Sequence, residues 1–186
     1  MNVYDFDKTI FFPDSSACFL LHCLKKYPRV LMSNSLSILM SYIRYKRDSG
    51  TLPELKEALF SFLPYIDAER EADLFWRKHY ADIQPWYLKN KRADDVIVSA
   101  SPEFLIRPIA RMLGVSYIAT SMSPSSGKIQ GLNNSGSEKV RRFKKVYPEE
   151  QIDEFTSDSL EDTPMSRLAS KAYLIKKSIK KDWPIG

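Results

Sequence analysis

Hydrophobic and polar positions divide the chain into a short apolar strand, a long helical stretch and a second part of mixed pattern. The run MNVYDFD at residues 1–7 predicts a short buried strand that ends in acidic residues. Asp14, Ser15 and Ser16 offer helix N-cap side chains, and the pattern then stays helical to about residue 90. Within that stretch, LSILMSYI at 36–43 predicts the buried core of a helix.

The second part alternates strand-like and helix-like segments. Strands are predicted at 94–101, 115–122 and 152–159, helices at 102–114 and 137–147, a short hairpin at 125–134 and an edge strand at 171–177. Pro108 is expected to interrupt or kink its helix, and Gly114 to end it. This alternation favours an α/β fold with a mostly parallel sheet.

Chemically active side chains stand at the ends of three predicted strands: Asp5 with Asp7, Ser99 with Ser101, and Asp158 with Ser159. In parallel α/β sheets, ligands bind beyond the carboxyl ends of the strands. Because side chains at i and i+2 of a strand share a face, we expect Asp5 and Asp7 to point the same way. Ser101 by itself is expected to cap the helix that follows it.

Two or three carboxylates in one place repel one another unless a cation lies among them. Asp5, Asp7 and Asp158 are hard oxygen donors of the kind that suits Mg²⁺. Ser99 can donate its hydroxyl to a phosphate, and Lys139, at the start of a basic helix, supplies a compact cation. Such a set serves phosphoryl transfer in which one carboxylate attacks phosphorus and another moves the proton.

Four motifs in this order make the chain resemble the haloacid dehalogenase (HAD) superfamily phosphatases, in the phosphoserine-phosphatase-like branch, subfamily IB. They are DFDKT at 5–9, Ser99 at the end of VIVS, Lys139 in GSEKVRRF after the GKIQG segment, and DSLEDTPM at 158–165. The resemblance covers essentially the whole chain. It implies a Rossmann-like core formed by residues 1–12 and 89–186, and an inserted α-helical cap of the C1 type formed by residues 13–88.

The resemblance also implies a role for each acidic motif residue. Asp5 would be the nucleophile and a Mg²⁺ ligand. Asp7 would be the general acid and base, with its backbone carbonyl on the metal. Asp158 would be the other carboxylate ligand of Mg²⁺, and Asp162 would support the site from behind the ligands.

For the phosphate, the resemblance implies that Thr9, Ser99 and Lys139 form the binding set. Asp14 stands where phosphoserine phosphatases carry a glutamate that recognises the substrate amine, so it is the expected specificity residue. The matching cap cation has two candidates, Arg44 and Arg47. Because Asp14 is one methylene shorter than glutamate, L-phosphoserine is not the favoured substrate, and we expect another small phosphorylated metabolite.

Net charge and the apolar cap segment leave other functions open. The chain of 186 residues has a net charge of +5, which suits an anionic partner. The run LSILMSYI together with that charge suggests a phosphatase for a lipid-linked phosphate at a membrane surface, if the run is exposed. A non-catalytic phosphate-binding module is a further alternative. Nucleic acid is not expected, because the basic runs lack interleaved aromatic residues.

Targeting features are weak in this sequence. No apolar run approaches the roughly 20 residues that span a bilayer, so no integral membrane segment is expected. The N-terminal residues lack the basic and apolar regions of a signal peptide, and a cytoplasmic location is therefore expected.

Overall fold

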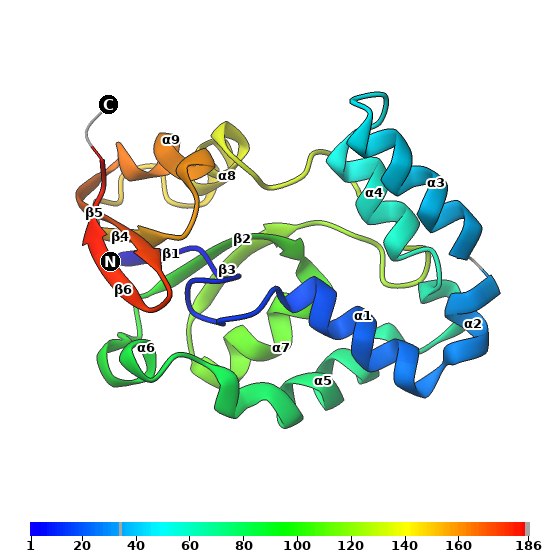
Figure 1. Ribbon diagram of the computed structural model, residues 1–186. Coiled ribbons are helices and arrows are strands. Elements are labelled where there is room, and N and C mark those ends of the chain that lie inside the picture. The colour runs from blue at the N-terminus through cyan, green and yellow to red at the C-terminus, as the bar shows by residue number, and fades with distance from the viewer. Residues whose placement is uncertain (34, 185–186) are drawn as a thin grey trace.

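The computed structural model describes residues 1–33 and 35–184, and Figure 1 shows a twisted sheet with helices around it. The six-stranded sheet has the order β3-β2-β1-β4-β5-β6, and all neighbours are parallel except β5 and β6. The strands are β1 (Asn2–Tyr4), β2 (Val96–Pro102), β3 (Ser116–Thr120), β4 (Ile152–Ser157), β5 (Ala169–Lys176) and β6 (Ile179–Asp182). The predicted α/β fold with a mostly parallel sheet is confirmed.

Helices make up most of the chain from the end of β1 to the start of β2, as the sequence predicts. They are α1 (Ser15–Lys26), α2 (Pro28–Ser33), α3 (Ser35–Lys46), α4 (Leu52–Leu59), α5 (Ala68–His79) and α6 (Pro85–Asn90). Three more helices follow: α7 (Glu103–Leu113), α8 (Ser137–Val146) and α9 (Thr163–Ser166). Short 3₁₀ turns lie at Leu63–Tyr65, Tyr80–Asp82 and Leu160–Asp162.

The position of β1 in the sheet explains why acidic residues follow it. Val3 pairs with Val96 on β2 and with Phe155 on β4, so β1 is a central strand buried on both sides. Its end therefore lies between the ends of β2 and β4. The backbone N–H of Asp5 continues the pairing with a hydrogen bond of 2.9 Å to the carbonyl of Thr156.

The main core lies between the sheet and the helices α1, α5 and α7. Phe75 and Trp76 of α5 are fully buried, and the indole N–H of Trp76 donates to the carbonyl of Leu105 on α7 at 2.6 Å. Tyr87 of α6 packs edge-on against Tyr4 of β1. Thus α5, within the range 13–88, and α6, which crosses its end, bury apolar side chains in the core. The division at residues 12 and 88 stays a prediction.

The prediction that LSILMSYI forms a buried helix core is wrong. The segment is helical, but none of the described residues of α3 is buried, and Leu36 is 71% exposed. Figure 1 shows α3 at the outer edge of the molecule beside α4. The described structure places no further layer over α3, and an apolar spacing alone does not reveal whether a layer is present.

Three smaller expectations also change. The predicted edge strand, now β5, is not at the edge of the sheet, because β6 pairs with it through a tight turn at Lys177 and Ser178, both with positive φ. The hairpin predicted at 125–134 is present but begins earlier, with one bridge between Met122 and Ile129 and a backbone hydrogen bond on either side of it. The helix α7 runs through Pro108 without a break, and Gly114, with φ of 69°, ends it as predicted.

Candidate active site

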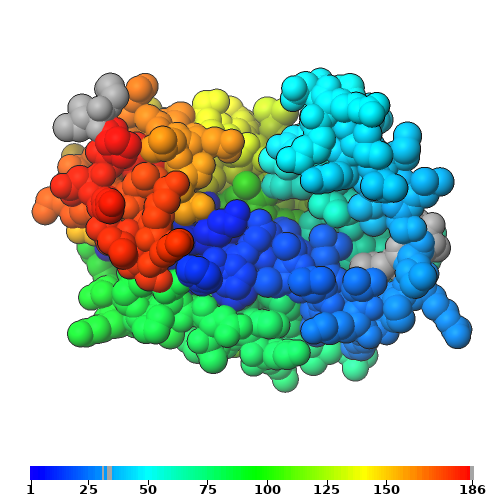
Figure 2. Space-filling view, in the orientation of Figure 1, coloured from blue at the N-terminus to red at the C-terminus, as the bar shows by residue number. Residues whose placement is uncertain are grey.

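A cleft of about 450 Å³ opens at the carboxyl ends of β1, β2 and β4. Figure 2 shows the hollow between the lobe of α3 and α4 (cyan) and the lobe that runs from α8 to β6 (yellow to red). Its polar lining includes Asp5, Asp7, Lys8, Asp14, Lys56, Ser101, Lys139, Asp158 and Asp162. The three strand ends singled out in the sequence therefore meet at one cavity, where small-molecule sites are found in such sheets.

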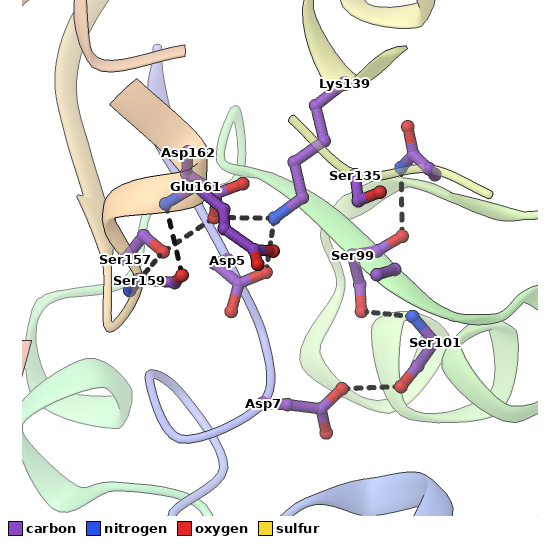
Figure 3. Close-up of polar contacts among 12 residues, drawn as sticks. Asp5, Asp7, Ser99, Ser101, Ser135, Lys139, Ser157, Ser159, Glu161 and Asp162 are labelled. Carbon is purple, nitrogen blue, oxygen red and sulfur yellow. Dashed lines mark hydrogen bonds and ion pairs between the residues drawn. The ribbon is translucent and has the colours of Figure 1, made fainter. Parts of the chain in front are cut away.

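Lys139, Asp5 and Asp162 form a buried charge cluster on the core side of the cleft (Figure 3). The Nζ atom of Lys139 lies 2.6 Å from Oδ1 of Asp5 and 2.7 Å from Oδ2 of Asp162. The hydroxyl of Ser157 donates to the same Oδ2 atom of Asp162 at 2.7 Å. Each carboxylate therefore has a partner that offsets the cost of its burial.

The charges in this cluster shift one another's titration. Burial raises the pKa of Asp5 to about 7, although the Lys139 ammonium opposes the rise. Burial by itself lowers the pKa of Lys139, but the charges of Asp5 and Asp162 outweigh it, and the pKa is raised. Lys139 is thus held as a cation beside a carboxylate that titrates near neutrality.

Asp7 lies on the other side of the cleft floor and is held by α1 and β2. Its carboxylate accepts a hydrogen bond of 2.6 Å from the backbone N–H of Ser15, the first residue of α1, and another from the Ser101 hydroxyl. Burial and the nearby Asp14 charge raise the pKa of Asp7, whereas the hydrogen bonds from Ser101 and Ser15 lower it. The net rise favours a carboxyl group that can carry a proton.

Ser101 belongs to the site, and the expectation that it caps a helix is wrong. Pro102 takes the N-cap position of α7 with no side-chain hydrogen bond. The side chain of Ser101 instead points at Asp7 (Figure 3). Its alternation with Ser99 along β2 was the available signal, because residues two apart in a strand share a face.

Ser99 and Thr9 lie beneath the cleft rather than on its surface. Ser99 is fully buried, and its hydroxyl accepts a hydrogen bond of 3.0 Å from the backbone N–H of Ser101. Thr9 is also fully buried, in the turn after β1, and its hydroxyl has no hydrogen-bond partner in the described part of the chain. Phosphate binding by these two hydroxyls stays a prediction.

Asp158 follows β4 and lines the cleft together with Asp5. Burial raises its pKa, while the charge of Lys8 opposes the rise. Within residues 1–33 and 35–184, no group of three His, Cys, Asp or Glu side chains is close enough to hold a metal ion alone. Two carboxylates and a backbone carbonyl are nevertheless hard oxygen donors, and Mg²⁺ completes such a set with water and phosphate oxygens. The donors present therefore fit Mg²⁺.

Asp14 lines the cleft and also caps α1, because its carboxylate accepts a hydrogen bond of 2.9 Å from the backbone N–H of Ala17. The prediction that Arg44 or Arg47 supplies the cap cation is wrong. Neither Arg44 nor Arg47 lines the cleft, and Arg44 lies 3.8 Å from Glu54 on the surface.

The cap cation in the cleft is Lys56 of α4, which sequence reasoning missed. Its Nζ atom donates to the carbonyl of Ala100 at 2.9 Å and to Oδ1 of Asn133 at 2.8 Å, so it joins the cap to the core. Burial lowers its pKa. The available signal was helical spacing, because Leu52, Lys56 and Leu59 lie on one face of α4 and all line the cleft.

Comparisons with solved structures identify similar folds. A protein of unknown function from Bordetella pertussis Tohama I is 20% identical, with a TM-score of 0.73 over 92% of this chain and 87% of that chain. A HAD family hydrolase from Salmonella enterica serovar Typhi is 10% identical, with a TM-score of 0.63 over 91% of this chain and 60% of that one. A phosphoserine phosphohydrolase-like protein from Francisella tularensis SCHU S4 is 19% identical, with a TM-score of 0.56 over 96% and 89%.

The sequence itself provides the family assignment. No protein with a curated description matches the chain. The family model described as haloacid dehalogenase-like hydrolase matches residues 3–167, which include all four motifs. The chain therefore belongs to the haloacid dehalogenase-like hydrolases, as the motifs predict.

Proposed function

We propose that the protein is a Mg²⁺-dependent phosphomonoesterase that works through an aspartyl-phosphate on Asp5. The observation that carries this proposal is the buried contact of Lys139 with Asp5 and Asp162, with Asp7 on the opposite side of the same cleft. Two solved folds that the chain resembles support it by their descriptions. One is phosphoserine phosphohydrolase-like, and the other is a phospho-aspartyl intermediate analogue of phosphoserine phosphatase.

In the first step, a carboxylate oxygen of Asp5 attacks phosphorus and the bond from phosphorus to the leaving oxygen breaks. Asp7 gives its proton to that oxygen, and the raised pKa of Asp7 suits this task. Lys139 is held as a cation beside Asp5 and stabilises the negative charge on the phosphoryl oxygens.

In the second step, Asp7 takes a proton from water as the water oxygen attacks phosphorus, and the bond to Asp5 breaks. The products are inorganic phosphate and free Asp5, so the enzyme is regenerated. Asp5 and Asp158, with the backbone carbonyl of Asp7, would hold Mg²⁺, which when bound supplies positive charge for the phosphate oxygens. Asp162 keeps Lys139 in place through the 2.7 Å contact.

Phosphate release from p-nitrophenyl phosphate tests the proposal. We expect turnover with Mg²⁺, loss of turnover with EDTA, and a fall of at least about 1,000-fold for Asp5→Asn. Asp48→Asn, an exposed residue of the cap, is the matched control and keeps the full rate. If neither turnover nor Mg²⁺-dependent binding of BeF₃⁻ appears, the non-catalytic phosphate-binding module takes the place of the enzyme.

A further inference from the structure

An apolar groove of about 660 Å³ lies between α1, α3 and α4 on the outside of the cap. We call it the cap groove, and its walls include Leu20, Leu24, Ile38, Leu39, Tyr42 and Leu59. Leu39 is 52% exposed and Met32, also in its wall, is 68% exposed. Large apolar side chains gathered in one open groove mark a surface that binds an apolar partner.

The cap groove begins at the wall of the catalytic cleft. Ala17, Leu20 and Leu59 line both the groove and the cleft that contains Asp5, Asp7 and Lys139. The polar end of a bound molecule can therefore lie at Asp5 while its apolar end follows the groove outward. A substrate that fits both spaces has a phosphate head and a long apolar tail.

One segment of the cap carries an excess of positive charge, although the whole range 13–88 has ten Lys and Arg against nine Asp and Glu. Residues 15–47 contain Lys25, Lys26, Arg29, Arg44, Lys46 and Arg47, and no Asp or Glu. These six positive charges exceed the +5 of the whole chain, so the remaining residues sum to −1. Lys26 and Arg44 are ion-paired with Glu71 and Glu54, which offsets part of this charge. The segment that exposes the apolar residues of α3 still carries an excess of positive charge, a combination typical of helices that lie on anionic bilayers.

A second copy of the chain fits this surface poorly. In a symmetric dimer through the cap groove, the same basic segment would face itself, and like charges across an interface cost several kcal/mol. Such a dimer would also cover the path from the groove to the cleft. Within the described residues, no helix is long and apolar enough to cross a bilayer, so contact would be made at the surface.

We propose that the cap docks on an anionic bilayer and that the cap groove receives the acyl chain of a phosphomonoester lipid. The proposal deepens the proposed function and rests on it. The bond from phosphorus to the lipid oxygen breaks, Asp7 supplies the proton to that oxygen, and water completes the reaction. The products are the lipid alcohol and inorganic phosphate.

Vesicle sedimentation tests docking separately from chemistry. The probes are vesicles of phosphatidylcholine alone, of phosphatidylcholine with phosphatidylglycerol, and of phosphatidylcholine with phosphatidic acid. We expect Asp5→Asn to bind both anionic vesicles, and phosphatidic acid most tightly, without turnover. Leu39→Gln is expected to bind these vesicles at least about tenfold more weakly, because it removes one large apolar side chain that would contact the bilayer or the acyl chain.

Two matched controls accompany this experiment. Leu132→Gln changes a leucine that is 63% exposed outside the cap groove, and it keeps the parent affinity. Arg47→Gln in the basic segment is expected to weaken binding about fivefold, whereas Lys145→Gln on α8 leaves it unchanged. Equal binding to neutral and anionic vesicles overturns the proposal. Equal vesicle affinity with and without Leu39→Gln also overturns it.

Activity on two substrates separates the two claims. For Leu39→Gln we expect the rate ratio of phosphatidic acid in vesicles to p-nitrophenyl phosphate to fall at least about tenfold. Turnover of p-nitrophenyl phosphate without vesicle binding overturns the lipid proposal and leaves the phosphatase. Vesicle binding without turnover of either substrate overturns the phosphatase. If Leu39→Gln instead halves the mass in solution and no vesicle binds, the cap groove joins two copies, which also overturns the proposal.

Discussion

The core side of the cleft and the outer helix α3 of the cap differ in how their side chains meet water and protein. On the core side, polar groups are buried and paired, with Lys139 between Asp5 and Asp162 and Ser157 behind them. On the cap, α3 does not line the cleft and has no buried residue within the described chain, and Leu36 and Leu39 are 71% and 52% exposed. A buried charge is tolerated only when its partners are complete, whereas an exposed apolar helix leaves apolar surface in water, so a partner that covers it gains free energy. Under the proposed function, the core side holds the reacting groups and the cap recognises the substrate.

Removing Lys139 breaks the core side most severely. Lys139→Ala leaves Asp5 and Asp162 buried without their cation, so we expect a loss of about 3–5 kcal/mol in the free energy of unfolding. The loss shrinks at low pH, because the two carboxyl groups can then take up protons. Urea unfolding measures it. Lys144→Ala on the exposed face of α8 is the control and changes stability by less than about 0.5 kcal/mol.

Gly127 lies where the core and the cap are in close contact, so a larger residue at this position should disturb that contact. Gly127 has φ of +70°, and an added Cβ would lie 2.2 Å from the carbonyl oxygen of Phe60 at the end of α4. Gly127→Ala is therefore expected to cost roughly 2–4 kcal/mol in unfolding free energy. Gly131→Ala, which also has positive φ but no atom within 4 Å of the new Cβ, is expected to cost less. Equal losses would contradict the close contact.

Lys56 is the cap residue that places a positive charge in the cleft. Lys56→Met keeps the apolar stem and removes the cation, so we expect KM for p-nitrophenyl phosphate to rise about tenfold, the effect of one lost bond to a charged group. The control is Lys128→Met, whose ammonium is on the surface and 2.9 Å from Glu57. A change in kcat alone would show that Lys56 does not help to bind the anion.

The hydrogen bond from Ser101 lowers the pKa of Asp7. The Ser101 hydroxyl favours the charged form of Asp7, so Ser101→Ala should raise the pKa of Asp7 further. Because Asp7 must be protonated to act as the acid, the basic limb of the kcat/KM profile should move to higher pH. Ser135→Ala, at another cleft residue, is the control and leaves the limb in place. A shift to lower pH would exclude this role of Ser101.

The core side was the more predictable from sequence. Parallel strands end at one edge of a sheet, so the positions of Asp5, Ser99 and Asp158 at the ends of predicted strands place them at one edge. Motif spacing pointed to Lys139 and Asp162 as further members. The contact between these two residues lies outside such reasoning, because it depends on how α8 and the turn after β4 pack together.

The cap side was less predictable for a physical reason. The spacing of LSILMSYI gives an apolar face but not what covers it, and the helix is exposed where burial was expected. Lys56 was missed because it lies in an apolar stripe, where a lysine is easily taken as a solvent-facing residue. The position of α4 beside the core makes this stripe line the cleft, and that position is not readable from the sequence of α4 alone.

Chemical trapping of the phosphorylated residue tests the central claim most directly. The enzyme is quenched in acid during turnover of p-nitrophenyl phosphate with Mg²⁺, reduced with borohydride, digested and analysed by peptide mass. An aspartyl-phosphate is reduced to homoserine, and we predict this change at Asp5, with Asp7 and Asp158 unmodified. Homoserine at another residue, or sustained turnover with unmodified Asp5, would contradict the account.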